Sequence, residues 1–131
     1  MIYEETIVLT RPFEEVLALV KEAFAAEGFG TLTEIDMQAT MKTKIDKDMR
    51  PYAIIGACNP HLASRALDAE PQMGVLLPCN VVVRETDSGV VVEAMDPGLM
   101  VSITGVDAVK PIADQARELV GNALQRVAAA I

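Results

Sequence analysis

The chain has 131 residues, of which 51% are hydrophobic and 23% charged, and its formal net charge is −8. This length fits one domain, residues 1–131, and the hydrophobic share supplies a core, which excludes global disorder. An acidic surface repels phosphate backbones and anionic lipid headgroups, so we expect neither a nucleic-acid partner nor a membrane partner.

Neither a targeting signal nor a structural disulfide is expected. The first residues, 1–5, lack the basic region and apolar stretch of a signal peptide. No uncharged apolar run reaches the roughly 20 residues that span a bilayer, so we expect a cytoplasmic protein. In that reducing compartment, Cys58 and Cys79 are expected to be thiols.

The first half of the chain is predicted to alternate strands and helices. Residues 2–9 have the pattern of a strand, and Pro12 opens a helix that Gly28 ends, because glycine takes up left-handed backbone conformations at little cost. Residues 29–35 form a second strand. A short helix over 36–46 then places an apolar residue at every fourth position, namely Met37, Met41 and Ile45.

A buried strand and a well-marked helix follow. Residues 52–58 are almost wholly apolar, as expected of a central strand that is covered on at least one face. Asn59 followed by Pro60 is a strong helix start, since asparagine caps the first turn and proline loses no hydrogen bond there. The helix over 60–69 is predicted to bury Leu62, Ala63, Ala66 and Leu67.

The last third predicts a hairpin and two helices. Two valine-rich segments, 81–85 and 90–94, flank a Thr-Asp-Ser-Gly turn. Asp96 starts a short helix, and Asp107 is predicted to cap a long terminal one. The order is β-α-β-α-β-α-β-β-α-α, and the hairpin requires antiparallel pairing. We therefore expect an α+β fold with one mainly antiparallel sheet packed by helices; a small mixed α/β sheet is the alternative.

Cys58 is the first candidate for chemistry, because it ends an apolar strand and precedes a helix start. Backbone N–H groups and the helix dipole at such a position favour a thiolate and lower the pKa of a cysteine. The alternative interpretation is a buried cysteine that packs as a small hydrophobic side chain.

Cys79 follows Pro78, which lacks a backbone donor and holds the residue before it in an extended conformation. A ligand or partner would find irregular backbone there. The alternative is a tight start of a strand, in which the Asn80 side chain bonds local backbone. If their strands are neighbours, Cys58 and Cys79 face one pocket, and a reversible disulfide would require Cα atoms within roughly 7 Å.

His61 and Asp96 complete the candidates. Cys58 and His61 have the spacing of metal ligands, and Cys79 would make a third zinc or copper ligand; a structural zinc site requires four, and the other interpretation is a solvent-exposed histidine. Asp96 is interpreted as a helix cap, with a catalytic carboxylate as the alternative. No nucleophile elbow, phosphate-binding glycine loop or His-Glu-x-x-His motif is present.

Three segments in this order resemble one known family: Gly-Ala-Cys-Asn-Pro at 56–60, Leu-Leu-Pro-Cys-Asn-Val-Val-Val at 76–83, and Asp-Pro at 96–97. They are similar to the bacterial and archaeal domain of unknown function family 302 (DUF 302), and the resemblance covers nearly the whole chain. It implies a TATA-binding-protein-like α+β fold and a homodimer, but no established activity, and any cofactor stays unknown. The candidate residues that it carries over are Cys58, Asn59, Pro60, Pro78, Cys79, Asn80 and Asp96.

Three functions remain open from the sequence. The first is a thiol-based or small-molecule-binding domain with Cys58 and Cys79 near one pocket. The second is a non-catalytic homodimeric module in which the same segments only shape the fold. The third is a metal or haem site that uses Cys58, His61 and Cys79. The likeness to a DNA-binding fold carries no function by itself, and the charge of −8 argues against that role.

Overall fold

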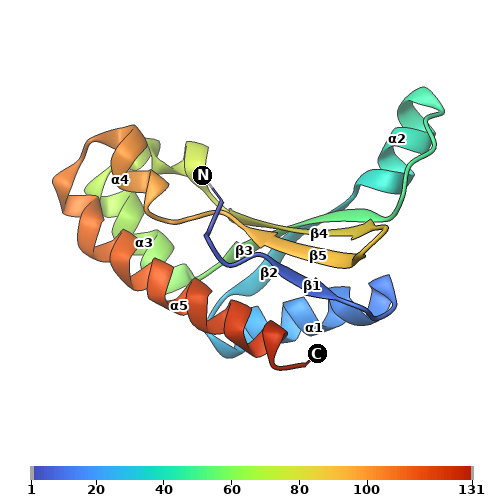
Figure 1. Cartoon of the computed structure of the whole chain (residues 1–131). Helices are drawn as coiled ribbons and strands as arrows, with labels where there is room; N and C mark the ends of the chain where they lie inside the picture. Colours follow the sequence, from blue (N-terminus) through green and yellow to red (C-terminus); the bar gives the residue numbers. More distant parts are fainter. Residues whose placement is uncertain (1, 131) are drawn as a thin grey trace.

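One antiparallel sheet with the strand order β1-β5-β4-β3-β2 forms the centre of the computed structural model, which describes residues 2–130 (Figure 1). Every strand pair is antiparallel, which confirms the predicted α+β class over the mixed sheet. The strands are β1 (Ile7–Leu9), β2 (Gly30–Asp36), β3 (Tyr52–Cys58), β4 (Cys79–Thr86) and β5 (Gly89–Ala94).

The helices follow the predicted order, with two short 3₁₀ segments added between them. Their bounds are α1 (Phe13–Ala26), α2 (Met37–Ile45), α3 (Pro60–Ala69), η1 (Pro71–Leu76), α4 (Leu99–Thr104), η2 (Asp107–Val109) and α5 (Lys110–Ala128). In residues 2–130, no helix combines the length and the apolar character that crossing a membrane requires.

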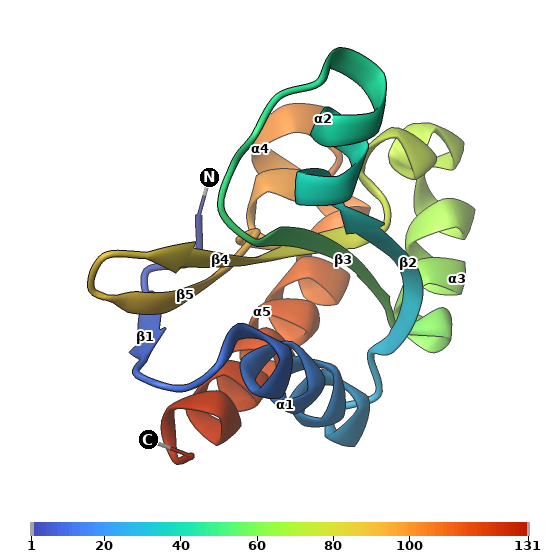
Figure 2. The ribbon, with the colours of Figure 1, turned by 90° about the vertical axis from the view of Figure 1, so that its right-hand side faces the viewer.

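The core lies between one face of the sheet and the helices α1 and α5, which run beneath it in Figures 1 and 2. Alternate residues of the central strands point into it, and the long apolar stripe of α5 packs against them. We call the face of the sheet that packs against α1 and α5 the inner face. Its fully or nearly fully buried residues include Leu9, Ala53, Ile55, Ala57, Val81, Val83 and Val92.

Local sequence signals set several of the element ends. The Asp36 side chain accepts a hydrogen bond from the Ala39 amide at 2.9 Å, and Asn59 caps α3. Gly28 has a φ of +86°, which is the left-handed conformation that lets the chain leave α1 and enter β2.

Three local predictions were wrong. The first strand is much shorter than residues 2–9, because only Ile7–Leu9 pair with β5, and Ile2 makes a single bridge to Met95. Leu67 was expected in the core but is 41% exposed, since α3 contacts the rest of the chain along a narrow stripe. Asp107 makes no capping hydrogen bond with its side chain; it begins η2, and α5 starts three residues later.

The opposite, outer face of the sheet is open. Figure 1 shows it above the sheet, bounded by α2 at one end and α4 at the other. None of the nine residues of α2 (Met37–Ile45) is buried, so the predicted apolar stripe of this helix does not enter the core of its own chain. Seen from that end in Figure 2, α2 stands above the strands.

Candidate functional site: a cavity lined by two cysteines

The two cysteines lie on neighbouring strands. Antiparallel pairing of β3 with β4 sets Ala57 directly opposite Cys79, so Cys58 lies one residue beyond this pair. Cys79 points to the inner face and is buried, whereas Cys58, where β3 gives way to α3, is half-buried. Both thiols are free. The strand register therefore brings together two segments that are 21 positions apart in the sequence.

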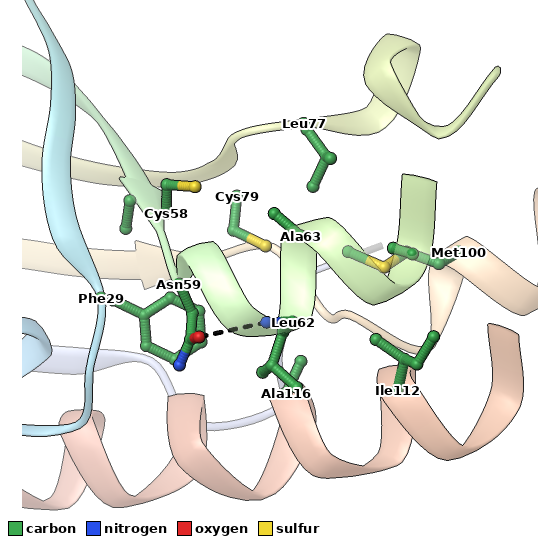
Figure 3. A pocket seen from close by; sticks show the side chains of 12 residues that line it. Phe29, Cys58, Asn59, Leu62, Ala63, Leu77, Cys79, Met100, Ile112 and Ala116 are labelled. Atoms are coloured by element: carbon green, nitrogen blue, oxygen red, sulfur yellow. Dashed lines mark hydrogen bonds between the residues drawn. The ribbon is translucent and has the colours of Figure 1, made fainter. Parts of the chain in front are cut away.

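Both cysteines line one small cavity, which Figure 3 shows from close by. Its volume is about 20 Å³, which is room for roughly one water molecule. The walls come from the ends of β3 and β4, from α3, α4 and α5, and from the segments before β2 and β4. The lining residues are Phe29, Ala57, Cys58, Asn59, Leu62, Ala63, Ala66, Leu77, Cys79, Met100, Ile112 and Ala116.

The start of α3 fixes one wall of the cavity. The Asn59 side-chain oxygen accepts a hydrogen bond from the Leu62 amide at 3.2 Å, drawn as the dashed line in Figure 3. This bond satisfies one of the amides that a helix start leaves without a partner. The other end of the amide group lies against Gly28, where an added Cβ would come within 2.9 Å of Asn59 Nδ2. Asn59 therefore has a structural role and also lines the cavity.

Burial determines the protonation of Cys79. Loss of hydration raises the pKa of its thiol to about 11, and the neighbouring Cys58 contributes further in the same direction. At neutral pH, Cys79 is consequently a neutral thiol in an apolar wall. The sequence predicted a favoured thiolate only at Cys58, and burial disfavours one at Cys79.

The chemistry available in this cavity is that of an apolar, polarisable surface. Two thiols, the thioether of Met100 and the ring of Phe29 lie among aliphatic side chains. Phe29 is held in place by an edge-to-face contact with Phe24, with ring centroids 6.1 Å apart. Such a lining favours small molecules of low polarity, because a polar guest would lose its hydrogen bonds to water without replacement.

Three of the other candidate residues lie around the cavity without lining it. Pro60 is exposed in the first turn of α3. Pro78 follows a cis peptide bond and packs over Gly56, where an added Cβ would meet Pro78 Cγ at 2.6 Å. Asn80 is exposed on the outer face, because it follows Cys79 in a strand and successive side chains alternate. There it lines a separate, open hollow of about 530 Å³, together with Tyr52 and Val82.

Asp96 lies outside both hollows. Its Oδ1 accepts a hydrogen bond from the Gly98 amide at 2.8 Å and lies 3.3 Å from Nε of Arg117. Arg117 also pairs with Glu4 and lies over the ring of Tyr3, 4.8 Å from its centroid. Asp96 is therefore not the predicted cap of α4, since Gly98 takes that position without a side-chain cap. It organises the turn that enters α4 and anchors it to α5, which is a structural role.

Cys58 and His61 have the sequence spacing of metal ligands, but the fold does not bring them into a metal-binding cluster. His61 is exposed in the first turn of α3 and does not line the cavity. Among residues 2–130, no three histidine, cysteine or carboxylate side chains gather closely enough to hold a metal ion. Cys58 and Cys79 are thus the part of that set that the fold brings to one place.

The profile of the family described as domain of unknown function DUF302 matches residues 5–127. The chain belongs to the DUF302 family. A solved DUF302 structure, that of an uncharacterized conserved protein from Bacillus stearothermophilus, is similar with a TM-score of 0.85 and 25% identity. The similarity covers 93% of this chain and 95% of that chain. None of the curated proteins matches. The family and the α+β fold predicted from the sequence are therefore both confirmed.

Much of the DUF302 cavity was not identifiable from the sequence. Leu62 was predicted to be buried, and Ile112 and Ala116 belong to the predicted terminal helix, but nothing in their spacing indicates that they border the same cavity. Met100 and Phe29 come from two further segments. The signal available in the sequence was the pair of Cys-Asn segments at strand ends. Three residues of these segments, Cys58, Asn59 and Cys79, line the cavity.

Proposed function

We propose that this DUF302 chain is a small-molecule-binding domain, and that its ligand occupies the cavity lined by Cys58 and Cys79. The observation that carries the proposal is that two Cys-Asn segments from separate parts of the chain contribute to one apolar cavity. Cys58 is the more exposed thiol and contacts the ligand or reacts with it. Cys79 forms part of the wall as a neutral thiol.

The size of the cavity limits the ligand. A volume of about 20 Å³ holds no more than a few atoms, so a larger molecule must displace side chains. Leu77 is suited to such a movement, because it is half-buried and belongs to the short segment between η1 and β4. The cavity is therefore the closed form of a site that opens around a small, apolar guest.

The non-catalytic alternative has support from Asn59, Pro78 and Asp96, since each has a structural explanation. These explanations do not cover the thiols. Serine or alanine would serve the same packing at Cys58, which is half-buried. The binding proposal therefore rests on the thiols, in a cytoplasmic setting that keeps them reduced.

Dimethyl sulfide and dimethyl sulfoxide form a matched pair of probes, because they differ by one polar oxygen. Three heavy atoms at a ceiling of about 1.5 kcal/mol each allow a dissociation constant no tighter than roughly the millimolar range. We expect dimethyl sulfide to raise the unfolding temperature of the protein and to slow alkylation of Cys58 by iodoacetamide. Dimethyl sulfoxide at the same concentration should do neither.

Two variants of α3 make the test specific. Ala63 lines the cavity, so Ala63→Met fills it and should abolish both effects of dimethyl sulfide. Ala69 lies on the same helix but does not line the cavity, so Ala69→Met is the matched control and should retain them. Equal responses of the two variants would refute binding at this cavity.

A further inference from the structure

A larger space than the cysteine cavity lies on the outer face of the sheet, at the end that α4 bounds in Figure 1. This is the open hollow that Asn80 lines, and its volume is about 530 Å³. Small-molecule sites commonly have roughly 300–1,000 Å³, so the hollow admits a ring-sized ligand without movement of side chains. The proposed function makes no use of this space.

Apolar side chains from four segments line part of the hollow. Val82 belongs to β4, Met95 follows β5, Leu99 begins α4, and Ile2 comes from the N-terminal segment. Ile2 is held there by its β-bridge to Met95. Together these side chains offer an apolar ligand more contact than one exposed residue would, and they therefore favour a ring or a short hydrocarbon group.

An ion pair lines the same hollow. Arg84 of β4 and Glu93 of β5 are diagonal neighbours in the strand register, and Arg84 Nε donates a hydrogen bond to Glu93 Oε1 at 2.6 Å. Their side chains are 36% and 19% exposed, so the pair is partly sheltered from water. Tyr52 lies directly opposite Arg84 on β3 and also lines the hollow. The pair therefore keeps the guanidinium in a defined position beside the apolar lining.

The ion pair offers donors and an acceptor side by side. Its hydrogen bond uses Arg84 Nε, so the Nη groups can donate to a ligand, while Glu93 Oε2 can accept from one. The pair has no net charge, and the whole chain has −8. An anion bound to Arg84 would lie against the Glu93 carboxylate, and a cation bound to Glu93 would lie against the guanidinium. A neutral group that both donates and accepts avoids both repulsions.

We propose that the hollow is a binding site for a neutral ring compound that carries a carboxamide or lactam group. The carbonyl oxygen of that group accepts hydrogen bonds from the Nη groups of Arg84, and its N–H donates to Glu93. The ring lies against Val82 and the apolar side chains around it. The site is separate from the cysteine cavity, and it takes a ligand of different chemistry.

Benzamide and benzoate are the probes, because they have the same shape and differ in charge at neutral pH. In a methyl NMR titration of the full chain, benzamide should shift the signals of Val82, Met95 and Leu99, with a dissociation constant in roughly the millimolar range expected of a fragment. Benzoate should bind roughly tenfold more weakly, because Glu93 repels it. Benzamide should leave the signal of Ile112, which lines the cysteine cavity, unchanged.

Substitutions of the ion pair test the two polar contacts. Arg84→Met keeps an unbranched apolar side chain but removes the guanidinium, and it should weaken benzamide binding roughly tenfold or more. Arg126 also pairs through Nε with a glutamate, Glu27, at 3.1 Å, but it does not line the hollow, so Arg126→Met is the matched control and should leave binding unchanged. Glu93→Gln keeps the shape of the side chain but removes its negative charge, so it should reverse the preference and make benzoate the tighter ligand.

Three results would overturn the proposal: no shifts at the methyl groups of the hollow, tighter binding of benzoate than of benzamide by the wild type, or equal benzamide binding by Arg84→Met and Arg126→Met. If circular dichroism shows that Arg84→Met does not fold, Glu93→Gln decides, and an unchanged preference for benzamide contradicts the proposal. Dimethyl sulfide should not shift the methyl signals of the hollow, so failure of benzamide to bind would leave the ligand proposed for the cysteine cavity intact.

Discussion

Gly56 of β3 pairs directly with Thr33 of β2, and a Cβ at position 56 would come within 2.1 Å of Thr33 Oγ1. The same Cβ would lie 2.6 Å from Cγ of Pro78, the residue that precedes Cys79. Glycine at this position therefore lets three segments approach one another next to the cysteine cavity.

Gly56→Ala should destabilise the protein by about 1–3 kcal/mol, because the hydroxyl of Thr33 can rotate away but the ring of Pro78 cannot. Urea unfolding followed by circular dichroism measures the change. Gly30→Ala is the matched control in the neighbouring strand, since nothing lies within 4 Å of a Cβ there, and it should leave stability nearly unchanged. Equal stability of the two variants would show that the crowding at Gly56 is relieved without cost.

The buried thiol of Cys79 predicts a loss of stability in alkali. Its pKa in the folded protein is about 11, above the ordinary value of 9.0, so the folded state holds the proton more tightly than the unfolded state. The stabilisation of the folded state by this thiol is therefore complete below pH 9 and is lost as the pH rises towards 11. The difference between the two pKa values corresponds to roughly 2–3 kcal/mol in the free energy of unfolding.

Other groups titrate in this range, so the test compares the wild type with Cys79→Ala. The free energy of unfolding of the wild type should fall more steeply between pH 9 and 11 than that of the variant. Parallel curves would mean that Cys79 is not held as a neutral thiol. The Cys58→Ala variant should retain the steep dependence, because the main cause of the raised pKa is the burial of Cys79.

Asn59→Ala should cost about 1 kcal/mol of stability, because it removes the acceptor for the Leu62 amide at the start of α3. Asn59→Asp keeps that acceptor and should recover most of the loss. Thermal unfolding of the three proteins measures this. If Asn59→Asp were as unstable as Asn59→Ala, the packing of the amide against Gly28 would be the more important contact.

Asp96→Asn should leave dimethyl sulfide binding unchanged, because Asp96 does not line the cavity. The asparagine oxygen still accepts from the Gly98 amide, and the partly exposed ion pair with Arg117 contributes less than about 1 kcal/mol. Binding is measured by protection of Cys58 from alkylation, and stability by urea unfolding. Loss of protection in a stable Asp96→Asn protein would restore this carboxylate as a site residue.

The predictions that succeeded from the sequence depend on neighbouring residues. Asn59 and Pro60 specify the start of α3 because a cap and the first helical position require only local contacts. The hairpin of β4 and β5 was predicted for the same reason. The family resemblance also predicted that the family's domain covers nearly the whole chain, and the profile match over residues 5–127 confirms this.

The predictions that failed depend on contacts across the fold. Leu67 has helical spacing with buried residues, but no element packs on its side of α3, so it remains exposed. Spacing also predicted an amphipathic helix at α2, although Met37 and Met41 of its stripe are only half-buried and Ile45 is exposed. Likewise, the sequence placed Cys79 and Asn80 in one candidate site, whereas the alternation of β4 sends them to opposite faces of the sheet.

The most direct test of the proposed ligand site is a methyl NMR titration of the wild type with dimethyl sulfide. The proposal predicts that the shifting signals are those of Leu62, Leu77, Met100 and Ile112, which line the cysteine cavity, and that Ala63→Met removes these shifts. Shifts confined to Ile2, Val82, Met95 and Leu99, which line the open hollow of the outer face, would contradict it. So would an unchanged spectrum at concentrations well above a millimolar dissociation constant.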